Sequence, residues 1–239
     1  MRALLILAAL LALTAAPSRA ETTLGIEGVM VSGTHAEQAG SAPISGVAPL
    51  LELRQRWKTV DLAIEGIPSV GGRSYLVAPH GVPQPLTNVS VFNALAHLRI
   101  GRTDRFWIGG GIVIINQQTS LLSPPLAAAS RVTGSRYEAR AFLPSGHMGT
   151  LELRAAYMPA MHGSVSYELG PIPVPPGYDS EVAEATDWTA EYVLHLRGVD
   201  FGAGVRDIDY QAHFVSPPAL ADRNTSFGAI LEARFKVAR

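Results

Sequence analysis

The chain has 239 residues, a formal net charge of −1 and no cysteine, and 47% of its residues are hydrophobic. The lack of cysteine excludes disulfides, cysteine-based metal sites and a catalytic thiol, so the fold must be held by hydrogen bonds and packing. A net charge near zero provides no broad basic surface for a nucleic acid. The seven histidines are scattered without metal-ligand spacing, and we expect neither a metal nor a cofactor.

The N-terminus has the layout of a secretory signal peptide. Arg2 supplies a positive charge, Ala3–Ala16 is an almost unbroken apolar run, and Ser18 and Ala20 place small residues at a cleavage site. This run is shorter than the roughly 20 residues of a membrane-spanning helix. We therefore assign residues 1–20 to a signal peptide and residues 21–239 to one exported domain.

Alternation of apolar and polar residues then predicts ten strands of about 9–12 residues, a length that suits a tilted strand crossing a bilayer. In chain order they are Thr22–Ser32, Gly46–Trp57, Val60–Ile67, Thr87–Ile100, Arg105–Asn116, Val132–Leu143, Thr150–Met158, Ala185–Arg197, Val199–Phe214 and Ser226–Val237.

Two of these segments depart from simple alternation. Arg105–Asn116 is apolar on both faces and carries Gly109, Gly110 and Gly111, which permit bending and close approach in a curved sheet. In Val199–Phe214 the apolar parity changes halfway, and we expect a β-bulge near Arg206 to reconcile the two halves.

The connections between the segments alternate between long and short. The predicted long loops are Thr34–Pro43, Pro68–Leu86, Gln117–Arg131, Pro159–Glu184 and Val215–Thr225. Up-and-down outer-membrane barrels show this asymmetry, with short periplasmic turns and longer external loops. If both termini lie in the periplasm, the first loop is external, in agreement with its length.

The last predicted strand, Ser226–Val237, shows that the central question is whether the apolar faces of the strands point inward or outward. Phe227, Leu231 and Phe235 share one face of Ser226–Val237, and Glu232 and Arg234 share the other. In a soluble protein the apolar face would point inward, whereas in a transmembrane barrel it points outward into lipid. Beyond the signal, no apolar run approaches helical span length, so a membrane-spanning form of this chain must be a closed barrel.

In this pattern of strands and loops the mature chain resembles the small bacterial outer-membrane β-barrel proteins. The resemblance implies an all-β fold, an antiparallel up-and-down transmembrane barrel of about ten strands in the bacterial outer membrane. It also implies contact with outer-membrane lipid and lipopolysaccharide, delivery by the barrel-insertion machinery, and a monomer. These proteins commonly end on an aromatic residue. This chain departs from them, because Phe235 is followed by four more residues. Trp57, Trp107, Tyr157, Trp188 and Phe235 are candidates for an aromatic girdle.

Charged residues of both signs occupy the faces that would line the lumen. The candidates for lumen ion pairs are Glu52, Arg54, Arg56, Arg136, Glu138, Arg140, Glu152, Arg154, Glu191, Arg197, Glu232 and Arg234, with Glu65 and Arg99 on the same faces. Ion pairs that fill a narrow interior are one interpretation. The other is a polar channel whose charges select small solutes.

Two further functions stay open. Asp207, Asp209 and His213 lie near the external end of their strand, and such a set can activate water. The omptin proteases carry Asp–Asp and Asp–His pairs at their outer rim, although their aspartate-x-histidine pair is absent from this strand. The lipid A deacylases use serine and histidine, and no histidine here has a matching serine. One open function is therefore a hydrolase of the outer rim, omptin-like or lipid A-modifying; the alternative for these three residues is an ordinary solvated strand end. The other open function is a soluble periplasmic barrel that binds an apolar ligand.

Overall fold

The computed structural model describes residues 21–37, 40–77, 83–122, 125–146, 149–169, 179–214 and 221–238. The predicted signal peptide and the proline-rich run at 171–176 lie outside these residues. Within them there is no helix with the length and apolar character needed to cross a membrane.

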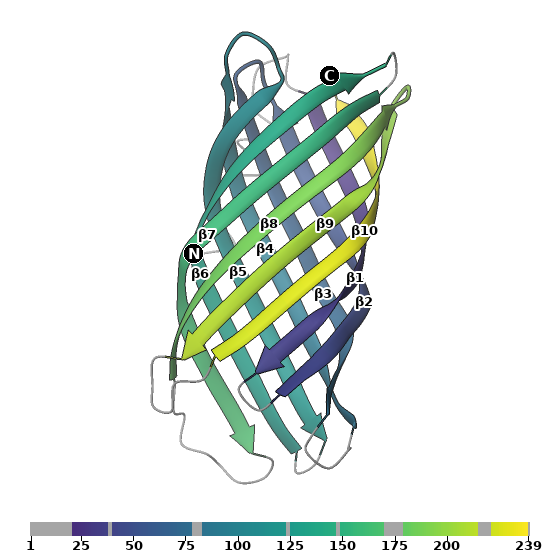
Figure 1. The fold of residues 1–239 in the computed structure, drawn as a ribbon. Coiled ribbons are helices and arrows are strands. Elements are labelled where there is room, and N and C mark those ends of the chain that lie inside the picture. The colour runs from purple at the N-terminus through teal and green to yellow at the C-terminus, as the bar shows by residue number, and fades with distance from the viewer. Residues whose placement is uncertain are drawn as a thin grey trace.

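The described residues form ten antiparallel strands that close into one barrel. Each strand pairs with the next along the chain, and β10 closes on β1. The strands are β1 (Glu21–Glu37), β2 (Gly40–Arg56), β3 (Val60–Val77), β4 (Pro83–Ile100), β5 (Phe106–Leu122), β6 (Pro125–Ser145), β7 (Gly149–Leu169), β8 (Asp179–His195), β9 (Val199–Phe214) and β10 (Ala221–Ala238). They run at a tilt to the barrel axis (Figure 1). The predicted fold class is therefore confirmed.

The predicted strands are too short at one end of the barrel, except Val199–Phe214, which matches β9 at both ends. The strands have 16–21 residues, because they continue into the segments that we assigned to long loops. Within the predicted loop Pro68–Leu86, for example, β3 continues to Val77 and β4 begins at Pro83. The prediction stopped each strand where the apolar alternation stopped, whereas the hydrogen-bonded ladder goes on.

The bulge predicted in β9 is also wrong. The register of β9 runs without a shift against both β8 and β10. A register shift occurs instead on β7, between Met158 and Met161. Pro159 lies in this irregular stretch, where its missing N–H costs no ladder hydrogen bond, so β7 continues past the proline.

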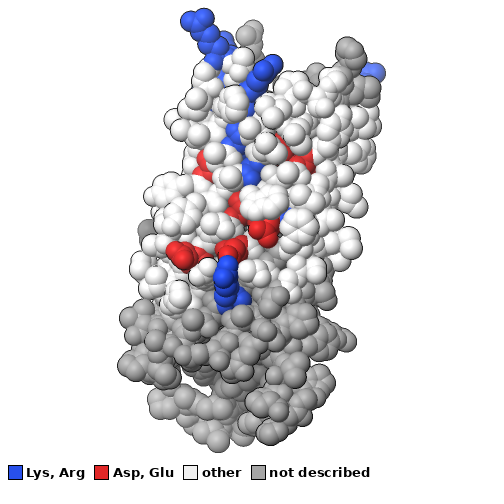
Figure 2. Space-filling model, viewed as in Figure 1, with Lys and Arg blue, Asp and Glu red and all other residues white. Residues whose placement is uncertain are grey.

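The wall is apolar on the outside and charged on the inside over the half of the barrel that carries the short turns. Leu231 and Phe235 are 66% and 44% exposed, while Arg140 and Glu232, on the other face of the wall, are buried. Uncharged side chains make up most of the described surface in Figure 2. This arrangement is the reverse of a soluble protein and is that of a transmembrane barrel.

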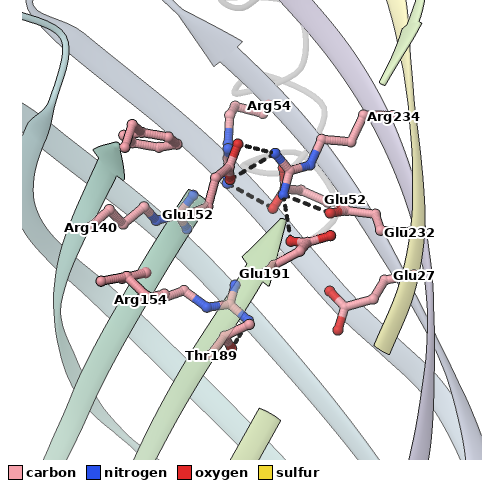
Figure 3. Close-up of a pocket in the computed structure, with 12 residues that line it drawn as sticks. Glu27, Glu52, Arg54, Arg140, Glu152, Arg154, Thr189, Glu191, Glu232 and Arg234 are labelled. Atoms are coloured by element: carbon pink, nitrogen blue, oxygen red, sulfur yellow. Dashed lines mark hydrogen bonds and ion pairs between the residues drawn. The ribbon is translucent and has the colours of Figure 1, made fainter. Parts of the chain in front are cut away.

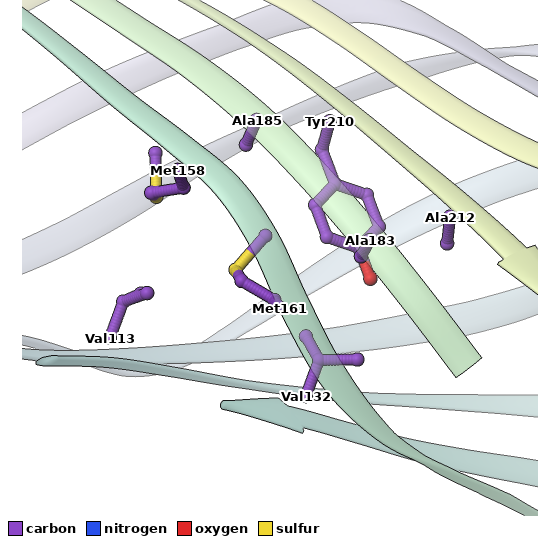
Figure 4. Close-up of a cluster of buried hydrophobic side chains, with 8 residues drawn as sticks. All are labelled: Val113, Val132, Met158, Met161, Ala183, Ala185, Tyr210 and Ala212. Atoms are coloured by element: carbon purple, nitrogen blue, oxygen red, sulfur yellow. The ribbon is translucent and has the colours of Figure 1, made fainter. Parts of the chain in front are cut away.

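Toward the other end, the interior becomes apolar. A cluster of buried side chains from β5 to β9 lies there (Figure 4): Val113, Val132, Met158, Met161, Ala183, Ala185, Tyr210 and Ala212. A second, smaller cluster consists of Val29, Ala48 and Ile230. The lumen therefore has an ionic layer and an apolar layer, one after the other along the barrel axis.

Candidate functional site

The ionic layer of the lumen is the candidate site, because it gathers most of the buried charges of the described chain. Successive strand residues point to opposite faces, so every second residue of β2, β6 and β10 enters the lumen. In β6 these residues are Arg136, Glu138 and Arg140, each at most 5% exposed. Sequence parity alone therefore places three charges of one strand side by side.

Asp187 on β8 joins two arginines from different strands. Its carboxylate accepts hydrogen bonds from Nε and Nη2 of Arg206 at 3.0 and 2.8 Å, and from Nη2 of Arg136 at 2.9 Å. Arg136 also donates to Glu138 at 2.7 and 2.9 Å. These four side chains form a paired cluster, which satisfies the requirement that buried charges be neutralised and hydrogen-bonded.

Arg234 on β10 is the centre of a second cluster (Figure 3). Its Nη1 donates to both oxygens of Glu152 at 2.8 Å, and its Nη2 lies 3.1 Å from Glu191 and 2.6 Å from Glu232. One guanidinium thus holds carboxylates from β7, β8 and β10 together. A planar guanidinium with five donors is suited to this role.

Glu65 and Glu138 connect the remaining arginines. Arg140 donates to Glu65 at 3.0 Å and to Glu138, and Arg154 contacts Glu65 at 3.3 Å. On β2, Arg54 donates to Glu52 at 2.9 Å. The network therefore extends around the lumen and is not confined to neighbouring strands.

The structure brings together all but one of the residues nominated for lumen ion pairs. Arg56 contacts Asp61 at 3.4 Å. Arg197 does not join the network: it is exposed in the turn after β8 and forms no ion pair with another described residue. Residues that the nomination missed include Glu27, Asp61, Asp187, Arg206 and Asp200. Asp187 shares the parity of Glu191, so the alternation already indicated it, whereas Arg206 was assigned to the bulge that does not exist.

Little space is left in this layer. The cavity between Glu27, Glu191, Arg54 and Arg234 has a volume of about 30 Å³, which is room for no more than a few water molecules. The apolar cluster of Met158, Met161 and Tyr210 lies in the next layer of the lumen. Such layers fill the interior of a narrow barrel with side chains.

Glycines on the inner wall make the long side chains fit. Gly109 on β5 pairs with His97 on one side and Glu138 on the other. Because Gly109 has no side chain, His97 Nε2 reaches to 3.2 Å from Glu138 Oε1 across the strand. Sequence reasoning noted these glycines as places for close approach but did not identify what approaches them.

We predict that Gly109→Ala destabilises the barrel by about 1–3 kcal/mol, the usual cost of overpacking. A Cβ at Gly109 would lie 2.0 Å from the Ala96 carbonyl oxygen and 2.6 Å from the His97 Cα, so backbone must move. The measurement is urea unfolding in lipid vesicles. Gly28→Ala is the matched control, because its Cβ meets nothing nearer than 3.8 Å. Equal midpoints for the two variants would contradict the prediction.

The candidate rim residues lie on the outer face of the wall. Asp207 accepts a hydrogen bond from the Trp188 indole at 2.8 Å, and Asp209 accepts two from Arg223 at 3.0 and 2.5 Å. His213 is exposed on the same outward parity. They do not converge on a cleft with one another, and the described residues contain no group of three or more His, Cys, Asp or Glu that could hold a metal.

The predicted girdle needs one correction. Trp107 points inward and is 1% exposed, with the Arg56 guanidinium 5.2 Å from its ring centre. Of the predicted residues, Tyr157, Trp188 and Phe235 are exposed on the outer face, and the other exposed aromatic side chains of the described strands are Phe106, Tyr137, Tyr192, Phe201 and Phe227.

Several solved structures are similar to this chain. The outer membrane protease OmpT from Escherichia coli superposes with a TM-score of 0.59 at 9% identity, over 90% of this chain and 96% of that one. Neisserial surface protein A gives a TM-score of 0.39 at 11% identity, over 90% of this chain and 96% of that one. A Pseudomonas aeruginosa FadL homologue gives 0.41 at 11% identity, over 91% and 90% of the two chains.

No family model and no curated protein matches the sequence. The likeness to OmpT, at such low identity, concerns the fold and not the activity. The chain has the fold of the outer-membrane β-barrel proteins, as its strand pattern indicated.

Proposed function

We propose that this protein is an outer-membrane β-barrel with a closed lumen, which serves as a structural or surface-exposed protein of the bacterial envelope. The observation that carries the proposal is that ion pairs around Arg234 and Asp187 join strands across the lumen and that the apolar cluster around Met161 lines the part beyond them. A small solute would have to break buried ion pairs and then pass a dry apolar constriction.

The outer wall supports the location. Large apolar side chains such as Met30, Ile108 and Leu231 are more than half exposed on it, and an exposed apolar surface of this extent is unfavourable in water. The same polarity argues against a soluble periplasmic barrel, which we expected to keep its apolar residues inside. Export by the predicted signal peptide, insertion by the barrel machinery and a monomeric state are parts of the proposal.

Electrical recording in planar bilayers tests the closed lumen. We expect the inserted protein to give no sustained conductance in concentrated KCl. Insertion is verified separately by the faster migration of the unheated, compact barrel relative to the heated chain on a gel, so that silence does not mean failure to insert. Stable single-channel steps from the inserted protein would overturn the proposal and favour a narrow passive channel.

A further inference from the structure

The outer face of the barrel changes from apolar to polar partway along the strands. On β6 the outward residues Ala141, Ala139 and Tyr137 are followed by Ser135 and Thr133. Each of these residues belongs to the same face, because Arg136, Glu138 and Arg140 between them are buried in the lumen. The change therefore takes place within one continuous strand.

The strands β8 and β9 show the same change. On β8, Trp188 is the last aromatic residue of the outer face, and Thr186 and Glu184 follow it, both exposed. On β9, Phe201 lies in the apolar part of the outer face, and Asp209, farther along, is bonded to Arg223 of β10. Three strands and the neighbouring β10 thus become polar on the outside toward the same end of the barrel.

The inner face changes in the opposite sense at about the same place. On β8 the buried residue Asp187 is followed by Ala185 and Ala183, and on β9 Arg206 is followed by Tyr210 and Ala212. Ala183, Ala185, Tyr210 and Ala212 belong to the apolar cluster of Figure 4. Beyond this place the wall therefore has the polarity of a soluble protein, with an apolar interior and a polar exterior.

Aromatic side chains mark the change on the outer face. Tyr137 and Tyr157 are directly paired across β6 and β7, and the rings of Trp188 and Phe227 lie 6.2 Å apart. Tyrosine and tryptophan favour the interface between hydrocarbon and headgroups, and girdles of such residues flank the apolar band of outer-membrane barrels. Tyr137, Tyr157, Trp188 and Phe227 lie on the outer face of β6, β7, β8 and β10. We call this set of four residues the aromatic ring of the barrel.

The length of the apolar band fits a single bilayer. A tilted transmembrane strand needs about 9–11 residues. From Phe227 to Val237 the outer face of β10 is apolar, and this segment accounts for one such span. The strand itself has 18 residues, so it is too long to lie wholly within the hydrocarbon.

We propose that the lipid-contacting surface ends at the aromatic ring, and that the barrel continues beyond it as a rigid, water-exposed tube with its own dry apolar core. This inference rests on the proposed function, since it requires the barrel to be inserted. The hydrocarbon of the bilayer covers the wall between the ring and the short turns, and the polar wall beyond the ring contacts headgroups and water. The polarity change places the boundary to within about one residue pair on β6, β8, β9 and β10.

Single cysteines on the outer face of β6 test the boundary, and the natural chain has no cysteine to interfere. Thr133→Cys and Ser135→Cys lie beyond the ring, and Ala139→Cys and Ala141→Cys lie between the ring and the short turns. Each variant, inserted in lipid vesicles, is exposed to a membrane-impermeant maleimide. Because the thiolate is the reactive form and is disfavoured in hydrocarbon, we expect the second pair to react at least about tenfold more slowly.

The outcomes separate this inference from the proposed function. If Thr133→Cys and Ser135→Cys are protected as well as the second pair, the barrel is inserted but the tube is not exposed, and the inference alone fails. If all four react at the same fast rate, the wall between the ring and the short turns is not in lipid, and the proposed function fails too. Thr186→Cys and Ala190→Cys on β8 repeat the comparison, and reaction of every variant in urea shows that each thiol is intact.

Discussion

Replacing Asp187 by alanine is expected to destabilise the barrel by about 3–5 kcal/mol, the cost of leaving buried charges without their partner. Asp187 is 2% exposed and holds the guanidinium groups of Arg136 and Arg206. Without its carboxylate, the two arginines face each other in the lumen, where Arg136 keeps its contact with Glu138 and Arg206 its contact with Glu27. The effect is measured as the shift of the urea unfolding curve in lipid vesicles, followed by tryptophan fluorescence.

The control is Asp209→Ala, which breaks an ion pair of similar geometry on the outside of the barrel. The Arg223 side chain of that pair is 54% exposed, and exposed pairs contribute little because water solvates each partner. We expect no clear shift for this variant. If Asp187→Ala unfolds at the same denaturant concentration as Asp209→Ala, the ion-pair cluster is not what holds this part of the lumen together.

Replacing Leu231 by arginine is expected to cost about 2–4 kcal/mol, the range for a cation on the lipid face near the bilayer midplane. Leu231 is 66% exposed on the outer face of β10 and lies about midway between Phe227 and Val237. The added guanidinium has no partner in hydrocarbon. Urea unfolding measures the cost, and the yield of heat-modifiable barrel after refolding into vesicles gives an independent readout.

The control for this variant carries the same substitution beyond the aromatic ring. Thr133→Arg is also outward-facing and exposed, and the proposed boundary places it in water or among headgroups, where charge is tolerated. We expect its stability to stay close to that of the natural protein. A cost as large as that of Leu231→Arg would show that hydrocarbon extends past the ring.

Much of the fold could be predicted because the wall of a barrel is a local pattern. Side chains alternate across a strand, so Phe227, Leu231 and Phe235 could be placed on one face and Glu232 and Arg234 on the other without any knowledge of their neighbours. The number of strands and their order followed from the same alternation and from the spacing of the loops. Most of the charged residues nominated for the lumen lie there for this reason, although Arg197 does not, and Glu27, Asp61, Asp187, Asp200 and Arg206 were missed.

The errors in the strand lengths and in the bulge of β9 have one common cause. We read apolar alternation as the sign of a strand, and it is the sign of a strand in contact with lipid. Where the wall leaves the proposed hydrocarbon region, the apolar positions move from the outer face to the inner face. Ile208 and Tyr210 are examples in β9, where the ladder is unbroken. That change looked like a bulge near Arg206 and like the start of a loop elsewhere.

In the segments that alternate regularly, the sequence by itself determined which residues face inward and that the polarity of the wall is reversed, since both follow from alternation along a single strand. Only the tertiary structure decided which charges meet. Arg234 contacts Glu152, 82 residues earlier in the chain, because closure and tilt of the sheet bring non-neighbouring strands to face each other across the lumen. The stagger of the ten strands sets the distances between these charges, and the stagger cannot be predicted from the alternation within a single strand.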